Sequence, residues 1–362
     1  MRYGLFVLAV VMSLVARPIV AAEPEVKTLV AKGVQFLRTS QAEDGSFSKE
    51  AGPGVTALVT ASLLRSDLPS SDPTVSRALE YVLKHQQPDG GIYGKDSHYQ
   101  NYETSLAILC LVEANTDGRY DEQIKKADGF LKKIQWDEGE GHDIDSPNYG
   151  GGGYGRHSRP DMSNTTFLVD ALKAAGAGED DPALQKALIF VSRSQNLESE
   201  HNATEFAAKV NDGGFYYTPA AGGSSQAGTT ANGGLRSYGS MTYAGLKSMI
   251  YAGVDQDDPR VKAAYEWIQR HFTLAENPGM GQQGLFYYFH TFAKALEAIG
   301  DDEIVDANGE KHPWRQELTK RLAELQNEDG SWLNKNDRWM EADPNLVTGY
   351  ALLALSYCHE QP

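Results

Sequence analysis

The side chains that can transfer protons gather where three predicted apolar helices begin. Glu103 directly precedes Thr104, His290 directly precedes Thr291, and Asp161 lies just before a third such helix. Burial and a neighbouring like charge both raise the pKa of a carboxyl, because both disfavour its ionised form. An acid catalyst near neutral pH needs a raised pKa of this kind. We therefore take Asp161, Glu103 and His290 as the candidate catalytic residues.

Each candidate also has a structural explanation. Asp161 and Ser163 are residue types that cap helix N-termini. Glu103 and His290 are equally compatible with a buried polar pair that neighbouring helices satisfy.

Aromatic and charged residues near the same predicted helix ends form a candidate substrate-binding set. Two long loops, residues 143–159 and 220–239, join this region, and long loops in a compact repeat commonly cover a site. The candidates are Tyr102, Tyr154, Arg236, Tyr238, Tyr287, Arg338, Trp339, Glu341 and Asp343. The alternatives are core packing for the aromatic residues and a surface salt-bridge cluster for Arg338, Glu341 and Asp343.

The elements that position these residues come from a sixfold repeat. Each copy has an amphipathic helix, a Gly-rich turn with an aromatic residue, and a more apolar helix. Asp-Gly and Gly-Gly pairs in the turns supply positive φ. The predicted amphipathic helices are residues 26–37, 73–84, 121–134, 182–193, 259–272 and 313–325. The predicted apolar helices are residues 56–64, 104–114, 165–175, 242–252, 291–299 and 348–358.

A helix that is apolar around most of its circumference must be buried on most sides. The apolar helices therefore form an inner ring and the amphipathic helices an outer ring. The sequence predicts an all-α fold, an α/α toroid of six helical hairpins around a central cavity. Residues 23–362 are expected to form one domain, because no Pro/Ser-rich linker divides them.

The N-terminus reads as an export signal. Residues 1–22 contain a basic start, an apolar stretch too short to span a membrane, and a small-residue site. We expect a secreted or periplasmic monomer with no integral membrane segment. A net charge of -16 and the lack of a basic stripe exclude nucleic acid as a partner. Cys110 and Cys358, both in apolar helical patterns, are expected to be buried free thiols.

With its six hairpins and its Gln-x-x-Asp-Gly-Ser-(Phe/Trp) turns at residues 41–47 and 326–332, the chain resembles the squalene–hopene cyclase and protein prenyltransferase superfamily. The resemblance covers nearly all of the chain after residue 22. It implies the toroid fold, whereas one fold can host unrelated reactions.

The cyclase signature is incomplete at the matching positions. In that family an Asp-x-Asp-Asp-Thr-Ala segment opens an inner helix, and its middle Asp is the proton donor. Residues 161–166 keep the first Asp and the Thr, but Ser163 occupies the donor position. A literal Asp-x-Asp-Asp at residues 255–258 precedes Pro259, where we predict helix capping.

The signatures of two related families are also incomplete. Residues 287–291 resemble the Tyr-His-Thr half of the prenyltransferase zinc site, but residues 240–242 lack the expected acid and thiol. The string at residues 281–284 has no reactive cysteine for a thioester. We therefore predict no metal and no cofactor.

Two functions from different classes fit these residues. One is an isoprenoid-binding, cyclase-like protein in which Asp161 is the surviving acid. The other is a glycan lyase or hydrolase with His290 or a tyrosine as base, and with Arg236 or Arg338 holding a uronate. A non-catalytic binding toroid is the third alternative. An aromatic and aliphatic lining would favour the isoprenoid ligand, and a polar cleft with paired carboxylates would favour the glycan.

Overall fold

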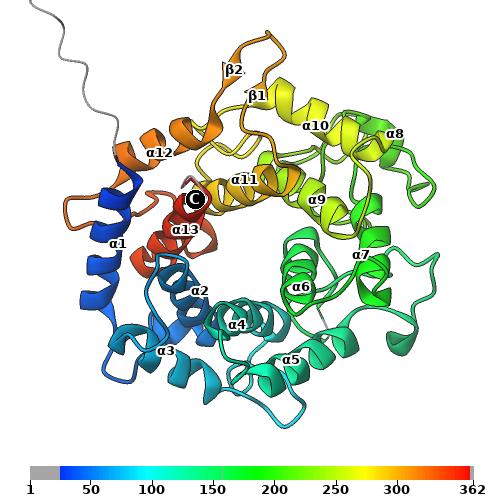
Figure 1. Cartoon of the computed structure of the whole chain (residues 1–362). Helices are drawn as coiled ribbons and strands as arrows, with labels where there is room; N and C mark the ends of the chain where they lie inside the picture. Colours follow the sequence, from blue (N-terminus) through cyan, green and yellow to red (C-terminus); the bar gives the residue numbers. More distant parts are fainter. Residues whose placement is uncertain (1–24, 157, 359–362) are drawn as a thin grey trace, which may run out of the picture.

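The computed structural model describes residues 25–156 and 158–358, which form a closed double ring of helices (Figure 1). Residues 1–22, the predicted export signal, lie outside the described residues. Six helices form the inner ring: α2 (Pro53–Leu64), α4 (Gln100–Ala114), α6 (Met162–Ala174), α9 (Gly239–Tyr251), α11 (Leu285–Ile299) and α13 (Pro344–Ser356). Six form the outer ring: α1 (Val26–Ser40), α3 (Pro73–Leu83), α5 (Asp121–Ile134), α7 (Pro182–Arg193), α10 (Pro259–His271) and α12 (Trp314–Leu325).

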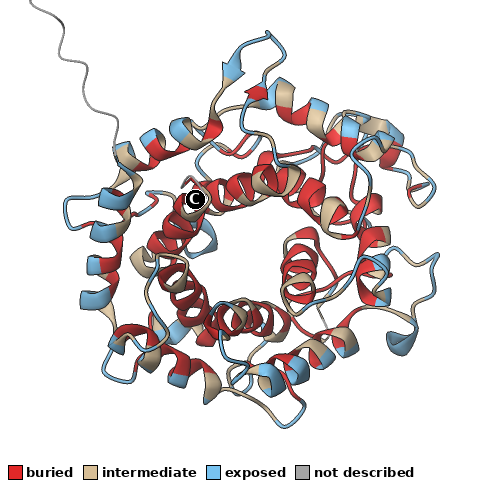
Figure 2. Ribbon diagram, in the orientation of Figure 1, coloured by how far each residue is buried: buried red, intermediate tan, exposed pale blue. Residues whose placement is uncertain are grey.

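Each inner helix packs against the next one along the chain, and α13 packs against α2, which closes the ring. The predicted toroid of six hairpins is confirmed. Inner helices are buried on almost all sides, whereas outer helices expose one polar face (Figure 2). None of the described helices combines the length and apolarity needed to cross a membrane.

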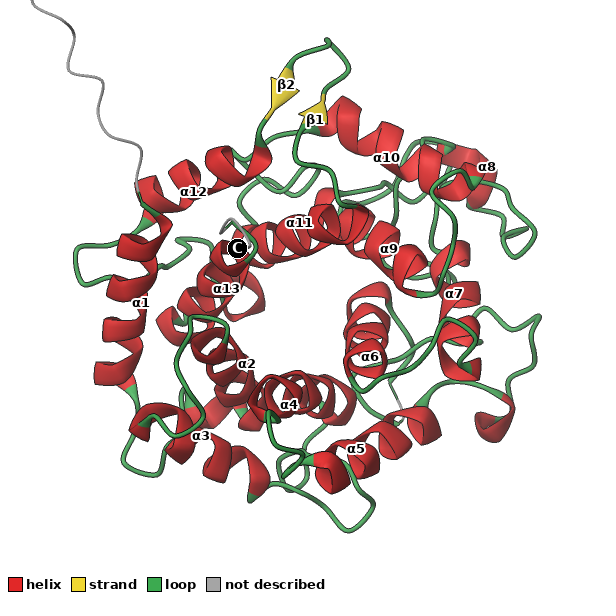
Figure 3. Cartoon of the chain, in the orientation of Figure 1, coloured by secondary structure: helices red, strands yellow, loops and turns green. Residues whose placement is uncertain are grey.

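The remaining regular elements are short (Figure 3). The helix α8 (Ala207–Val210) lies in the long connection between α7 and α9. Strands β1 (Ile304–Val305) and β2 (Lys311–His312) form an antiparallel hairpin between α11 and α12, which the sequence analysis did not foresee. Turns of 3-10 helix occur at Lys49–Ala51, Glu138–Glu140 and Arg338–Met340.

The inner helices begin three to six residues earlier than predicted, so the aligned threonines lie within the helices. Five of these threonines form hydrogen bonds with the preceding turn. The Oγ1 atom of Thr165, for example, accepts from the Gly152 N–H at 3.0 Å and donates to the Gly152 carbonyl at 3.4 Å. Thr56, Thr104, Thr242 and Thr348 accept from the equivalent turn N–H groups. The repeated threonine therefore fixes each turn to its inner helix.

The inner helices are parallel to one another, and all of them begin at the same end of the ring. At their beginnings, the Asn101 side chain of α4 donates to the Asn164 carbonyl of α6 at 3.2 Å. At their ends, Arg65, which follows α2, donates to the Ser356 hydroxyl of α13 at 2.9 Å. The ring consequently has two chemically different ends, one made of helix N-termini and one of helix C-termini.

One helix cap and the cysteines agree with the sequence analysis. Asp258 caps α10, so the acids of residues 255–258 belong to a helix start, as predicted, and Asp181 caps α7 in the same way. Cys110 and Cys358 are both buried free thiols.

The turn glycines give a direct test of the fold. Gly150 has a φ of 80° and faces the next outer helix, where an added Cβ would lie 1.8 Å from the Lys186 carbonyl oxygen. Gly141 also has a φ of 80°, but an added Cβ there meets nothing within 4 Å. We expect Gly150→Ala to lower the free energy of unfolding by about 2 kcal/mol more than Gly141→Ala, measured by urea denaturation. Equal losses would show that the turn does not pack against the next repeat as described.

Candidate functional site

Asp161 is the N-cap of α6 and is almost fully buried, with 2% of its surface exposed. Its Oδ1 accepts from the Asn164 N–H at 3.0 Å and from the Ser163 hydroxyl at 2.7 Å, and its Oδ2 accepts from the Asn164 amide at 2.9 Å. Burial raises the pKa of Asp161, while these donors act in the opposite direction. Ser163, which stands at the donor position of the cyclase signature, thus holds the carboxyl that remains.

Tyrosines surround this carboxyl. Burial raises the pKa values of Tyr154, Tyr217 and Tyr238, and the Asp161 charge raises them further, which places all three phenols within its electrostatic reach. Tyr217 was missed in the sequence analysis, because it follows the fourth turn, and the turns were given only a structural role. That turn meets the third inner helix: the Met162 N–H donates to the Tyr217 carbonyl at 2.8 Å.

A cluster of four aromatic rings, contributed by four inner helices, lies inside the ring. We call Tyr102, Phe167, Tyr287 and Tyr350 the axial aromatic cluster. Phe167 meets Tyr102 edge-on at 5.1 Å between ring centroids and lies 6.0 Å from Tyr287, which lies 5.9 Å from Tyr350. The hydroxyls of Tyr102 and Tyr350 are 3.4 Å apart. These side chains therefore meet inside the ring, and Tyr102 and Tyr287 are the half-buried, accessible members of the cluster.

Glu103 does not join Asp161. Its Oε2 accepts from the Gly94 N–H at 2.8 Å, and a Cβ on Gly52 would come within 2.4 Å of its Oε1. Burial raises the pKa of Glu103 to about 7. Within the described residues, no hydrogen bond links Asp161 to Glu103 or to His290. The expected cluster of these three groups is not formed, because Glu103 holds the segments before α2 and α4.

His290 lies about one helical turn deeper than the sequence alignment placed it. Because α11 begins at Leu285, His290 is its sixth residue, and Tyr287 takes the position near the helix start. The alignment failed here because Thr291 differs from the other aligned threonines: among the described residues no turn N–H donates to its hydroxyl, which donates only to carbonyls of its own helix. His290 is 6% exposed, and burial and nearby lysines hold its pKa well below the ordinary value.

Glu341 and Asp343 are helix caps and do not form the salt-bridge cluster considered above. The Oε1 of Glu341 accepts from the N–H groups of Phe286 and Tyr287, at 3.0 and 2.8 Å, and so caps α11 from a different repeat. Burial raises the pKa of Glu341 to about 7. Asp343 caps α13 by accepting from the N–H groups of Asn345 and Leu346.

The predicted arginines lie at the surface. Arg338 donates to the side-chain carbonyls of Gln226 and Gln283, and its guanidinium lies 4.4 Å from the Trp339 ring centroid. Trp339 is 40% exposed. Arg236 is exposed and donates to the Thr229 carbonyl at 3.1 Å. Arg338 is thus linked to the loop of residues 220–239 through Gln226.

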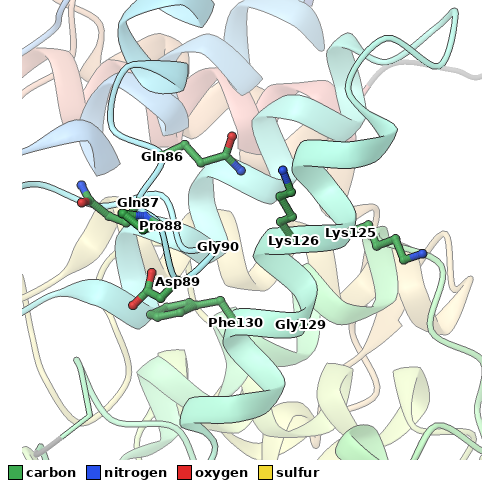
Figure 4. Close-up of a pocket in the computed structure, with 9 residues that line it drawn as sticks. All are labelled: Gln86, Gln87, Pro88, Asp89, Gly90, Lys125, Lys126, Gly129 and Phe130. Carbon is green, nitrogen blue, oxygen red and sulfur yellow. The ribbon is translucent and has the colours of Figure 1, made fainter.

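A groove of about 640 Å³ lies elsewhere, on the outer rim between the second turn and α5 (Figure 4). Its walls are made by residues 86–90 and by side chains of α5, and none of the predicted site residues lines it. Because it is separated from the inner helices, it is not continuous with the axial aromatic cluster.

One group of side chains has a spacing suited to a metal ion. Ligand atoms of Asp306, Glu310 and His312 lie within 4.8 Å of one another at the β1–β2 hairpin. The Oδ1 of Asp306 already accepts from two backbone N–H groups of the hairpin, and His312 Nδ1 lies 3.0 Å from Glu317 Oε1. These bonds explain the cluster as a feature that stabilises the hairpin.

The two raised glutamate pKa values predict how stability depends on pH. Glu103 and Glu341 bind protons more tightly in the folded chain, so their contribution to stability is complete below pH 4.5 and is lost as pH rises towards about 7. The loss is about 1.4 kcal/mol per pH unit for each carboxyl across that interval. Glu341→Gln should remove the part of this pH-dependent loss of stability that Glu341 causes. The measurement is the change in unfolding free energy between pH 5 and pH 7.5. The exposed Glu328→Gln is the control, and identical pH profiles for the two variants would contradict the assignment.

Comparisons with known proteins agree with this architecture. Residues 49–219, just under half of the chain, match the family model of the squalene-hopene cyclase C-terminal domain. The squalene–hopene cyclase of Alicyclobacillus acidocaldarius is 28% identical over 133 residues, which are 37% of this chain and 19% of that enzyme. The sequence match therefore spans a small part of that relative.

Solved structures match nearly the whole ring. The type II terpene cyclase MstE from Scytonema has a TM-score of 0.54 at 13% identity, covering 92% of this chain and 98% of that one. A polysaccharide lyase and a glycosyl hydrolase family 88 protein from Bacteroides vulgatus each have a TM-score of 0.55 at 10% identity, covering 92% of this chain and 96% and 99% of theirs. At these identities the structures show a shared fold, which hosts more than one chemistry.

Proposed function

We propose that this chain is a member of the terpenoid cyclase-like superfamily and that it binds an isoprenoid or a similarly apolar ligand inside the ring. The partial sequence match and the shared fold support this proposal. The ligand would lie against the axial aromatic cluster, at the end where the inner helices begin. The observation that carries the proposal is the convergence of aromatic rings from α4, α6, α11 and α13 beside a buried carboxyl.

The chemistry of this cluster favours an apolar ligand. Large aromatic side chains provide apolar contact area, and their π faces attract the partial positive charge that develops on a reacting alkene. Asp161 lies close enough for its charge to raise the pKa of Tyr287. Tyr287 and Tyr102 are half-buried, so a ligand entering from this end would meet them first.

Asp161 is the residue to which we assign the proton in any cyclisation. Its O–H bond would break as a C–H bond forms on an alkene carbon of the ligand. The carboxylate left behind would keep its hydrogen bonds from Ser163 and Asn164. MstE, which shares the fold, is described in complex with its substrate geranylgeranyl dihydroxybenzoate. The proposal transfers the class of ligand from such a protein, and not the ligand itself.

A sugar ligand has weaker support. The shared fold includes a polysaccharide lyase and a glycosyl hydrolase. In the described part of the chain, however, Asp161 and Glu103 do not face each other as a pair of carboxylates, and each is engaged by backbone N–H groups. An oligosaccharide is therefore the alternative ligand that the mass-spectrometry experiment below must distinguish from a lipid.

Mass spectrometry of material that co-purifies with the protein tests the class of ligand. We expect an isoprenoid or another apolar molecule, because the axial aromatic cluster offers apolar surface. Recovery of an oligosaccharide without any lipid would contradict the proposal and favour the glycan alternative.

Titration with geranylgeraniol tests the site itself. We expect Phe167→Ala and Tyr287→Ala each to weaken binding by about tenfold or more, through loss of apolar contact. Phe206→Ala is the matched control, because Phe206 belongs to a small separate cluster with Tyr216 and Leu235. Asp161→Asn keeps a capping residue and should retain binding while abolishing any turnover. Unchanged affinity in both axial variants would place the ligand elsewhere.

A further inference from the structure

A second cluster of polar side chains lies inside the ring, nearer to the end where the inner helices finish. The Nζ atoms of Lys247, from α9, and Lys294, from α11, lie 2.6 and 2.8 Å from the two carboxylate oxygens of Asp170, from α6. Lys247 and Asp170 each have 3% of their side chains exposed, and Lys294 has 11%. These residues form a buried triad with two cations and one anion.

The triad has an unbalanced charge. Removing an ammonium group from water is strongly unfavourable unless an anion compensates it, and Asp170 can neutralise only one of the two lysines. The next ionic groups along the axis, Arg65 and Glu113, pair with each other at 3.1 Å. Among the described residues, one buried positive charge is thus left without an anionic partner.

His290 lies one helical turn before Lys294 on the same face of α11 and adds an unused hydrogen-bonding atom. Its pKa is lowered by burial and by Lys294 and Lys247, so the ring stays neutral and does not add charge. Its Nδ1 has no hydrogen-bond partner among the described residues, although the side chain is more than nine-tenths buried. A buried polar atom without a partner is costly, so this nitrogen is available to a further hydrogen-bonding group.

Charge loss on Lys247 does not remove the imbalance at neutral pH. Burial, together with Lys294, lowers the pKa of Lys247 to about 8, and Asp170 opposes the shift. The amine is therefore mainly protonated at pH 7. The chain as a whole carries a net charge of -16, so a local excess of positive charge inside the ring is contrary to the average of the molecule.

We propose that Lys247, Lys294 and His290 form a binding site for an anionic oxygen group, a carboxylate or a phosphate, that enters from the end of the ring where α9, α11 and α13 finish. Such a group would accept charge-assisted hydrogen bonds from the two ammonium groups and one from the imidazole. Half-buried Arg65, Tyr251 and Tyr357 lie at this end. The site does not require an isoprenoid ligand, although the Tyr350 ring of the axial aromatic cluster lies 5.7 Å from the His290 ring.

Isothermal titration calorimetry with inorganic phosphate, at constant ionic strength set with potassium chloride, tests the site. We expect one site per chain, and a rise in Tm with phosphate beyond that with chloride. Lys247→Met and Lys294→Met should each weaken binding by about tenfold or more. Lys320→Met, which removes the same charge from an exposed position on α12, should leave binding unchanged.

A parallel titration with octyl phosphate distinguishes a free anion from the head group of an amphiphile. Binding of both probes indicates a free anion, and binding of octyl phosphate alone indicates a head group. Lys247→Arg retains the charge and should retain binding, which separates loss of the site from loss of the fold. The proposal is overturned if neither probe binds, or if the Lys247→Met and Lys294→Met variants, with native circular dichroism, bind phosphate as tightly as Lys320→Met.

Discussion

The packing of a turn glycine against the next outer helix, seen in five of the six repeats, is the constraint on which the ring depends. Cβ atoms added to Gly45, Gly90, Gly150, Gly213 and Gly330 would lie 1.8–2.7 Å from a backbone carbonyl oxygen of that helix, so only glycine allows the approach. All five have positive φ. Gly330 packs in this way on the Lys32 carbonyl of α1, which joins the last repeat to the first. The same local contact therefore both spaces the repeats and closes the ring.

A glutamine beside the turn strengthens the same joint. The side-chain amide of Gln135 donates to the Gly150 carbonyl at 2.8 Å and to the Ala183 carbonyl of α7 at 2.9 Å. Gln41, Gln195 and Gln326 make the equivalent pair of bonds to their own turn and to the following outer helix. One side chain thus satisfies two carbonyl groups that would otherwise lack a donor at the interface.

The fifth repeat departs from this pattern, and its inner helix carries most of the unusual chemistry. Thr291 bonds only to carbonyls of its own helix, and the first N–H groups of α11 instead donate to the Glu341 carboxylate of the sixth repeat. This helix supplies Tyr287 to the axial aromatic cluster and His290 and Lys294 to the charged triad. The buried Glu341 carboxylate thus replaces the threonine–turn hydrogen bonds of the other repeats. Its burial disfavours the ionised form, which raises the pKa of Glu341.

The sequence predicted the helices and turns well, but it predicted poorly where individual side chains lie along the ring axis. The sixfold repeat, the two rings and the cap at Asp258 follow from periodicity and turn chemistry, which are local. His290 was misplaced because its alignment used a threonine that no longer binds a turn. Glu341 was taken for a ligand-binding acid because its partners, two N–H groups of α11, lie more than 50 residues away. Phe167, Tyr350 and Asp170 were overlooked because apolar helices are expected to contain aromatic residues, and a single acid in one suggests no partner.

The direction of the inner helices explains why the two ends of the ring differ. Six N-termini meet at one end, and the partial positive charge of helix N-termini favours carboxylates there, as seen for Asp161, Asp343 and Glu341. Partial negative charge at the C-termini favours cations at the other end, where Arg65, Lys247 and Lys294 lie. Helix dipoles act within the last turn, however, and Lys247 and Lys294 lie about one turn before the ends of α9 and α11. The dipoles therefore explain the position of Arg65, which directly follows α2, whereas the two buried ammonium groups depend on Asp170 for compensation.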